Sequence, residues 1–392
     1  MPFRLEINSE VNIGQSSFDH KKIESINIEN VDYADFFEKY MVNNVPCIIK
    51  NVSASWECNT DWIKDNSINF DYFKQGLGEL QAPVANCDDI TFNTQCKIEM
   101  KIKDYMMYLE TEPKSKTLYL KDWHLKRLKP DSNFYYVPFV FASDWLNEFS
   151  LDNNEDDFMF VYIGPEKSWT PLHADVYNSH SWSVNVIGKK KWIFFPPKEE
   201  LKMKDSFGNL PLLFDASNFE GVEYYEIIQE KGDALFVPSG WHHQVVNMSD
   251  TISINHNWIN SSNLDIVTSS LLDTLTQVEK EISDLKDSIE FVSQCQVVLK
   301  ADYRMDLPDY IHFLCYIADK RIKQLNDDNI LFFGLYTIGQ NHIRYDLKII
   351  MKNLKVIASH PLIANQSLIP CIKCNINDII KSISKALDSV QL

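Results

Sequence analysis

The chain has 392 residues, of which 45% are hydrophobic and 12% aromatic, so it is long enough to form a large core and more than one structural unit. Its 38 basic and 55 acidic residues give a formal net charge of −17, which argues against a nucleic-acid-binding surface, because such a surface needs clustered Lys and Arg. The acidity is compatible with a basic substrate, although solubility alone is a commoner reason for it.

No targeting or membrane segment is visible in the sequence. The first residues, Met-Pro-Phe-Arg-Leu-Glu-Ile-Asn, contain no apolar stretch of a secretory signal, and no run is long enough to span a bilayer. The eight cysteines are therefore expected to be reduced thiols, including Cys371 and Cys374, whose C-x-x-C spacing lacks the second pair that a zinc site needs. We expect a cytoplasmic protein, with nuclear presence also allowed, that makes no direct contact with membrane or nucleic acid.

Residues 1–116 are predicted to form an N-terminal α/β extension. A helical pattern covers 33–40 and a buried strand follows at 45–49. A strand pair is expected within 82–98, and apolar residues at helical spacing predict a helix over 98–109.

Residues 117–262 are predicted to be the catalytic core. A strand is expected over 117–120, with residues 121–124 leaving it, and a short helix opens at 143. From 158 to 258 short strands alternate with Gly, Pro and Asn turns, which suits a jelly roll.

Residues 263–392 have the periodicity of a helical lobe. Apolar residues recur at helical spacing over 264–282, 306–325, 340–358 and 376–388. The fold class is therefore predicted as mainly β with α: a double-stranded β-helix (jelly roll, cupin-like) core, with an N-terminal α/β extension and a C-terminal helical lobe.

One short segment, His173-Ala174-Asp175, has the pattern of a metal site. Side chains two apart on a strand point to the same face, so the imidazole and the carboxylate can meet at one point. One more His would complete a two-His, one-carboxylate set, which holds iron(II) and leaves positions open. Either His242 or His243 can supply it. The two side chains point to opposite faces of a strand and only one face can line a barrel interior, so only one of them can be the ligand.

Three segments of the sequence resemble the JmjC family of iron- and 2-oxoglutarate-dependent oxygenases. They occur in the same order as in that family. They are Thr-x-x-His-x-Asp at 170–175, Gly-x-Lys-x-Trp at 188–192, and Gly-Asp-x-x-x-Val-Pro-x-x-Trp-x-His-x-Val at 232–245. The resemblance implies that His173, Asp175 and His243 bind Fe(II), with 2-oxoglutarate and O2 as cosubstrates and ascorbate as the reductant in vitro.

The far carboxylate of 2-oxoglutarate needs a cation, and three lysines follow Gly188. Strand alternation puts Lys190 on one face and Lys189 and Lys191 on the other, without showing which face is inside. The family resemblance implies that Lys190 is the cosubstrate lysine. It also implies further cosubstrate contacts from Thr170, Ser183, Asn255 and Tyr162. Several family members have Asn at the position of Ser183, and Tyr162 could equally pack in the core.

Segments 119–125, 238–245 and 251–258 look closer still to one JmjC subgroup, which hydroxylates a lysine of the translation termination factor. This resemblance implies a protein lysyl C-hydroxylase, and a homodimer formed through the C-terminal helices. A histone lysine demethylase is the alternative, but the acidic charge and the lack of zinc-finger spacing favour it less. A non-catalytic binding module ranks last, because the three metal ligands and Lys190 are all present.

Overall fold

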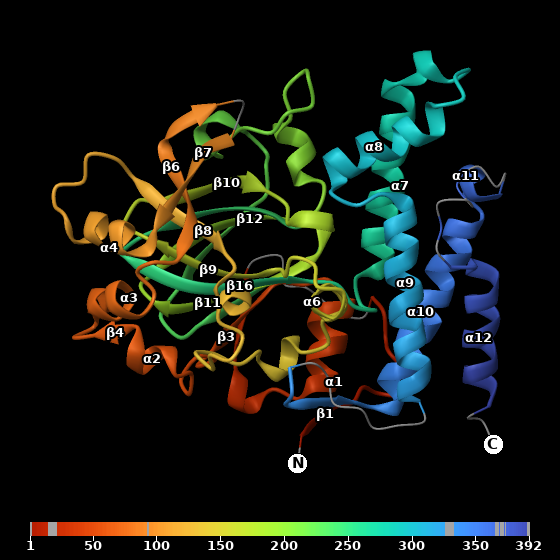
Figure 1. Cartoon of the computed structure of the whole chain (residues 1–392), viewed down its shortest axis with the longest axis horizontal. Coiled ribbons are helices and arrows are strands. Elements are labelled where there is room, and N and C mark those ends of the chain that lie inside the picture. Colours follow the sequence, from red (N-terminus) through yellow and green to blue (C-terminus); the bar gives the residue numbers. More distant parts are fainter. Residues whose placement is uncertain are drawn as a thin grey trace.

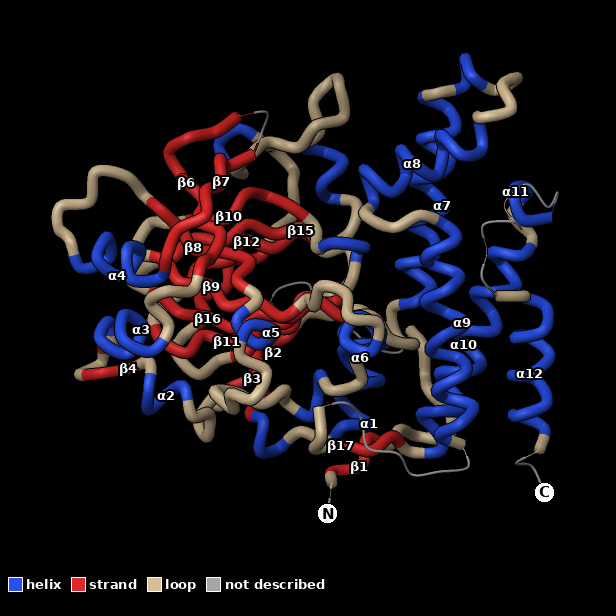
Figure 2. The backbone as a smooth tube through the Cα atoms, in the orientation of Figure 1, coloured by secondary structure: helices blue, strands red, loops and turns tan. Residues whose placement is uncertain are grey.

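The computed structural model describes residues 2–14, 22–91, 94–325, 333–364, 368, 372 and 374–389. The strands gather in one half of the molecule, and the C-terminal helices stand beside them (Figures 1 and 2). Within the described residues the strands form a nine-stranded and a four-stranded sheet plus two short pairs, one of them β4 (Ile63–Lys64) with β5 (Ser67–Ile68). This is the expected jelly-roll core with added helices.

The larger sheet combines strands of the N-terminal region with strands of the jelly roll. Its order is β2 (Glu24–Asn27), β3 (Cys47–Lys50), β14 (Ala234–Val237), β11 (His180–Ile187), β16 (Thr251–Trp258), β9 (Met159–Gly164), β8 (Leu118–Trp123), β6 (Gln81–Thr91) and β7 (Thr94–Lys101). On β11, Trp182 and Val184 belong to the largest hydrophobic core. Ser181 and Ser183 therefore face the opposite side, because side chains alternate along a strand.

The smaller sheet packs against part of the larger one. Its order is β10 (Trp169–His173), β15 (His242–Asn247), β12 (Lys190–Phe195) and β13 (Tyr225–Gln229). Trp192, Phe194 and Val245 of this sheet pack with Leu235 and Val237 of β14 in a separate apolar cluster. The two sheets thus enclose an interior that is partly apolar and partly lined by polar side chains of β11 and β16.

The helices before β9 lie outside the two sheets: most of them pack on the outer face of the larger sheet, and the last packs with the C-terminal helices. They are α1 (Tyr33–Phe36), the π-helical η2 (Phe37–Val42), α2 (Cys58–Asp61), α3 (Phe70–Gly76), α4 (Ile102–Glu110), α5 (Leu125–Leu128) and α6 (Trp145–Asp152). Phe36 of α1 contacts Phe236 of β14 at 5.8 Å between ring centroids. Short 3-10 turns are η1 (Ile28–Asn30), η3 (Phe139–Phe141), η4 (Val176–Asn178), η5 (Glu199–Met203), η6 (Ala216–Asn218) and η7 (Ser283–Leu285).

Two boundaries expected from the sequence are wrong. The helix expected at 98 begins at Ile102, because residues 98–101 pair with β6 as the end of β7. The strand expected to end at residue 120 continues to Trp123, which pairs with Val161 of β9. A register shift accommodates Asp122, whose φ of 58° is uncommon for a residue other than glycine.

The four C-terminal helices expected from apolar periodicity are confirmed. The lobe consists of α7 (Leu264–Glu281), α8 (Phe291–Tyr303), α9 (Leu307–Gln324), α10 (Gln340–Ala358), α11 (Pro361–Ala364) and α12 (Ile376–Asp388). The sequence did not predict α8, which buries only Cys295, Gln296 and Leu299. The N-terminal β1 (Phe3–Leu5) pairs in parallel with β17 (Tyr336–Ile338) beside this lobe. None of the described helices combines the length and apolar character that crossing a membrane requires.

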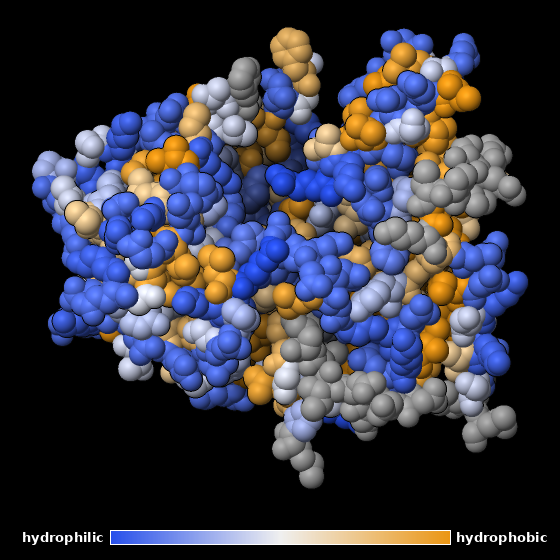
Figure 3. All heavy atoms as spheres, in the orientation of Figure 1, coloured by the Kyte–Doolittle hydropathy of each residue, from blue (hydrophilic) through white to orange (hydrophobic). Residues whose placement is uncertain are grey.

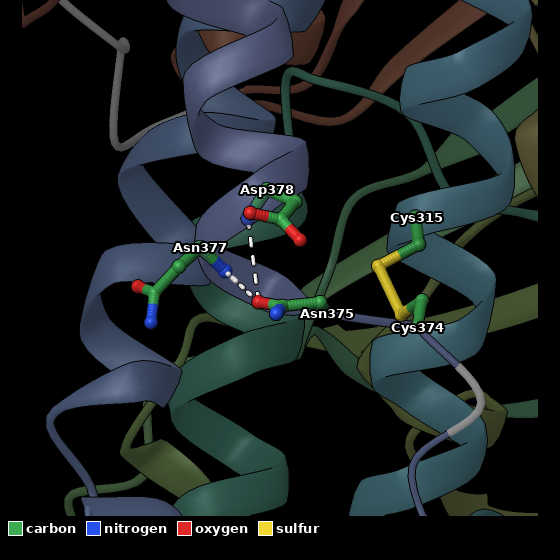
Figure 4. Close-up of a disulfide and its surroundings, with 5 residues drawn as sticks. All are labelled: Cys315, Cys374, Asn375, Asn377 and Asp378. Atoms are coloured by element: carbon green, nitrogen blue, oxygen red, sulfur yellow. Dashed lines mark hydrogen bonds between the residues drawn. A yellow bond between two sulfur atoms is a disulfide. The ribbon is translucent and has the colours of Figure 1, made fainter.

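The expectation that all cysteines are reduced thiols is wrong for Cys374, which forms a disulfide with Cys315 of α9 (Figure 4). The reason is tertiary: α12 packs against α9 and α10, and this brings together two residues that are 59 positions apart. Asn375, next in the chain, caps α12 by accepting hydrogen bonds from the backbone N–H groups of Asn377 and Asp378. Cys371 lies outside the described residues. The remaining described cysteines are free thiols.

A buried cluster of charges joins the helical lobe to the rest of the molecule. Arg321 of α9 binds Glu148 of α6 (2.9 Å) and Asp346 of α10 (3.0 Å), and none of the three side chains is more than 2% exposed. Ser261, just after β16, donates a hydrogen bond to Asp346 at 2.5 Å. Burial alone would raise the pKa of Glu148, but Arg321 and Lys320 beside it hold that pKa below its usual value. Arg321 is therefore the buried cation that the two carboxylates share, and Lys320 is a second cation beside Glu148.

Replacing Arg321 by Met should lower the free energy of unfolding by about 3–5 kcal/mol, because two buried carboxylates would lose the cation that they share, while Glu148 keeps a second one, Lys320. Lys300→Met, which removes the exposed pair with Asp309, is the matched control and should cost less than about 1 kcal/mol. Urea denaturation of both variants measures the difference. Equal losses in the two variants would contradict the structural role of the cluster.

Candidate metal centre and cosubstrate pocket

The antiparallel pairing of β10 with β15 brings two histidines together. His173 at the end of β10 is the direct cross-strand partner of His243 on β15, and the ring centroids are 4.4 Å apart. Asp175 follows β10 by two residues, at the start of the turn η4. One ligand atom from each of the three side chains lies within 4.8 Å of the other two. The structure thus assembles the three residues that the sequence marked as iron ligands.

Hydrogen bonds to the backbone fix the orientation of both imidazoles. The Nδ1 atom of His173 lies 2.8 Å from the carbonyl oxygen of Pro171, and Nδ1 of His243 lies 3.1 Å from that of Trp241. A carbonyl can only accept, so each Nδ1 carries a proton, and Nε2 is the nitrogen left to bind a metal. This is the arrangement in which a second partner orients a metal-binding histidine.

Two neighbouring side chains hold the carboxylate of Asp175. Ser181 donates to Oδ2 at 2.6 Å, and Asn257 donates to Oδ1 at 2.9 Å. Asn257 also donates to Ser179, so its amide has a fixed direction. Hydrogen bonds that favour the ionised form of a carboxylate suit a metal ligand.

The electrostatics of the centre favour metal binding. Burial, and next the neighbouring His173, lower the pKa of His243 to about 4, while Asp175 opposes the shift. His243 is therefore neutral near pH 7, which is the form that binds a metal. Two imidazoles and one carboxylate on one side of an ion fit iron(II) and leave its remaining positions for other ligands.

His242 lies on the other face of β15. Its side chain is 17% exposed and its Nδ1 is 3.8 Å from Glu200, whereas His243 is buried. Gln244, on the same face as His242, bonds to the backbone of Phe214 in the loop outside the barrel. The structure thus places His243, and not His242, on the same face as His173 and Asp175.

Lys190 points into the barrel while its neighbours point out. Its side chain is 2% exposed and Nζ donates to Oγ of Ser253 at 2.6 Å. Lys189 and Lys191 pair on the outside with Glu230 and Glu226. Burial, and then the charge of Lys121, lower the pKa of Lys190 to about 7. A buried lysine without an acidic partner among the described residues is suited to bind the carboxylate of a small ligand.

The other predicted cosubstrate residues lie on β9, β10, β11 and β16, and one of them, Asn255, shares its partner Ser253 with Lys190. Ser183 and Asn255 are direct partners across β11 and β16, and the buried hydroxyl of Ser183 has no hydrogen-bond partner in the described structure. Asn255 donates to Ser253 at 3.1 Å. Thr170 lies opposite Val245, one pair deeper along β10 than His173.

Tyr162 is close to Lys190, but its hydroxyl is already engaged in a hydrogen bond. Its ring centroid lies 5.7 Å from Nζ of Lys190, and its hydroxyl donates to Asp122 at 2.7 Å. Tyr162 therefore contributes a wall to the pocket, and in this arrangement it donates to Asp122 rather than to a bound carboxylate.

Sequence reasoning missed several polar residues of the interior. Ser253, Asn255 and Asn257 lie at every second position of β16 and so share one face, as Ser181 and Ser183 do on β11. A run of alternating polar residues inside strands that also carry Trp and Val was the available signal. Tyr119 of β8, which packs edge-on against Tyr162 at 6.0 Å between centroids, had no such signal.

Comparisons with known proteins agree with iron and 2-oxoglutarate chemistry. The family model described as a cupin-like domain matches residues 33–264. The 2-oxoglutarate and iron-dependent oxygenase JMJD4 homolog of Drosophila melanogaster is 40% identical, covering 85% of this chain and 87% of that protein. The human 2-oxoglutarate and iron-dependent oxygenase JMJD4 is 39% identical over 75% of each chain. The arginine-specific demethylase JMJ20 of Arabidopsis thaliana is 38% identical over 75% of this chain and 69% of that protein.

His243→Ala should weaken iron binding more than about 100-fold, because loss of a ligand exceeds the 10–100-fold cost of losing an outer partner. His242→Ala, on the outward face, should change it little. Titration of the metal-free proteins with Fe(II) under anaerobic conditions measures both. If His242→Ala alone loses the metal, the ligand assignment is wrong.

Cosubstrate binding should take up protons above pH 7. Lys190 is charged below its pKa of about 7 and partly neutral above it, so a bound carboxylate that requires the charged form draws in a proton. Affinity for 2-oxoglutarate should therefore fall as the pH rises from 7 to 9. Calorimetry of the Mn(II)-loaded protein at pH 8, in buffers of different ionisation enthalpy, counts the protons. Lys190→Arg should reduce the uptake and Lys191→Arg should not; an unchanged count in Lys190→Arg would exclude Lys190 as the source.

Proposed function

Because this chain belongs to the cupin-like JmjC family of 2-oxoglutarate and iron-dependent oxygenases, we propose that it is a protein lysyl hydroxylase that acts on a translation termination factor. The lysine target is supported by the resemblance of segments 119–125, 238–245 and 251–258 to the subgroup with that activity. The relatives named above support the oxygenase chemistry; their names do not state a lysine or a termination factor.

The complete ligand set is the observation that carries the enzyme assignment. His173, Asp175 and His243 converge, each oriented by a further hydrogen bond, and Lys190 lies buried in the same barrel. When bound, iron and 2-oxoglutarate supply the oxidising power that inserts one atom of O2 into a C–H bond, with succinate and CO2 as the other products. A binding module without catalysis would not need all of these groups.

The residues of this chain perform the binding and positioning. Ser181 and Asn257 fix the carboxylate of Asp175, and the carbonyls of Pro171 and Trp241 fix the two imidazoles. Lys190, held by Ser253, binds the far end of the cosubstrate. Trp192 and Phe194 on the same face of β12 keep that side of the pocket free of water.

Demethylation is the second candidate. The same centre can hydroxylate an N-methyl group, after which formaldehyde is lost, and the Arabidopsis relative with 38% identity is named an arginine-specific demethylase. The net charge of −17 is compatible with either basic substrate. Hydrophilic residues cover much of the face drawn in Figure 3, and this face is hollowed between the strand-rich half and the C-terminal helices. We further propose a cytoplasmic location, where translation terminates, and a homodimer formed through the C-terminal helices.

Incubation of the purified protein with Fe(II), 2-oxoglutarate, ascorbate and recombinant termination factor should add one oxygen atom to a lysine. Peptide mass spectrometry locates the modified residue. Asp175→Ala should abolish the reaction, because one of the three ligands is lost.

Peptides with methylated lysine or methylated arginine are the comparison substrates. Loss of a methyl group from either, with no oxygen added to the termination factor, would replace the hydroxylase proposal by demethylation. Absence of both products, and of succinate, would leave only the binding module.

A further inference from the structure

Lys121 is a second buried lysine in the barrel, and no role follows for it from the metal centre described above. It lies on β8 and its side chain is 6% exposed. Nζ donates to the side-chain oxygen of Gln95 at 2.7 Å and lies 5.6 Å from the ring centroid of Tyr119. The ammonium group therefore sits inside the protein and not at its surface.

Lys121 has no carboxylate partner of its own among the described residues. The nearest candidate, Asp122, accepts hydrogen bonds from Lys97 (2.5 Å) and from the hydroxyl of Tyr162 (2.7 Å), so its oxygens are already engaged. Burial lowers the pKa of Lys121 to about 8, although Asp122 opposes the shift. Burying an ammonium without a counter-charge is costly, so such a group usually has a function.

A pair of contacting aromatic rings connects Lys121 with Lys190. Tyr119, beside Lys121, packs edge-on against Tyr162, and Tyr162 lies beside Lys190. The charge of Lys121 is strong enough at Lys190 to lower the pKa of Lys190 further. Two like charges in one buried region repel each other until an anion joins them.

We propose that Lys121 is a second cation of the cosubstrate pocket, which acts together with Lys190 on the far carboxylate of 2-oxoglutarate. One carboxylate then relieves the repulsion between two buried ammonium groups, and the pocket selects a dicarboxylate over a 2-oxo acid with an uncharged tail. The inference depends on the use of 2-oxoglutarate and not on the identity of the protein substrate.

A bracing role is the competing account of Lys121. Gln95, its hydrogen-bond partner, also donates to the backbone carbonyl of Trp169 at 3.1 Å, so the three residues link β8, β7 and β10. Trp169 begins β10, so loss of the link would displace this strand together with His173 at its end and Asp175 just after it. Loss of a brace would weaken the binding of every 2-oxo acid alike. Loss of a charge that acts on the far carboxylate would weaken only the binding of an acid that has this carboxylate.

The test compares two 2-oxo acids that differ only at the far end: 2-oxoglutarate and 2-oxopentanoate, whose tail has no carboxylate. Binding of each to the Mn(II)-loaded protein is measured by calorimetry without any protein substrate. Lys121→Met should weaken the binding of 2-oxoglutarate about 10-fold or more, which is the usual effect of losing a charge-assisted hydrogen bond. The binding of 2-oxopentanoate should be unchanged. Lys121→Arg, which keeps the charge, should recover most of the affinity.

A second readout excludes a folding defect. Lys121→Met removes a buried charge that has no acidic partner, so the metal-free variant should melt no lower than the parent protein. Its gain in melting temperature on adding 2-oxoglutarate and Mn(II) should nevertheless be smaller. Lys101→Met is the matched control: Lys101 lies on β7, is 41% exposed in its side chain and pairs with the exposed Glu79, so this variant should bind both acids as the parent does.

Equal weakening of both acids by Lys121→Met would establish bracing and overturn the proposal. An unchanged affinity for 2-oxoglutarate would overturn it as well. Neither result would bear on the lysyl hydroxylase proposal, because no peptide takes part in the measurement.

Discussion

The register between β10 and β15 is the constraint on which the site depends. Antiparallel pairing sets His173 directly opposite His243, and a shift of one residue would turn His243 outward and bring His242 in. Buried apolar residues fix this register, since Val245 belongs to the cluster that joins the two sheets, whereas Gln244 bonds to the outer loop. The metal centre is thus specified by the same burial pattern that closes the barrel.

The barrel interior contains polar groups that a purely structural core would exclude. Ser181 and Asn257 hold Asp175, and Ser253 holds Lys190, so most of these groups are hydrogen-bonded. Three groups lack a full set of partners within the described residues: the hydroxyl of Ser183 has no hydrogen-bond partner, and the ammonium groups of Lys190 and Lys121 have no carboxylate partner. Unsatisfied buried groups cost stability, and a bound dicarboxylate is the partner that would satisfy them.

The C-terminal helices support the site from outside. Arg321 holds Asp346, and Asp346 accepts from Ser261 just after β16. Asn257, which orients the metal-binding carboxylate, lies near the end of that same strand. The buried charge cluster therefore connects the packing of the helical lobe to the strand that positions Asp175.

The sequence alone indicated an iron site, because ligand type and strand alternation are local properties: His173-x-Asp175 required no knowledge of the fold. The cosubstrate and the role of Lys190 came from the resemblance to the JmjC family, since alternation did not show which face of that strand is inside. Apolar periodicity likewise determined four of the C-terminal helices, including α9 and α10. Only the tertiary structure decided between the two faces of β12, because either alternation pattern is locally acceptable. It also decided the extension of β8 to include Lys121, the disulfide of Cys374, and the cluster around Arg321, since each depends on contacts between residues far apart in the chain.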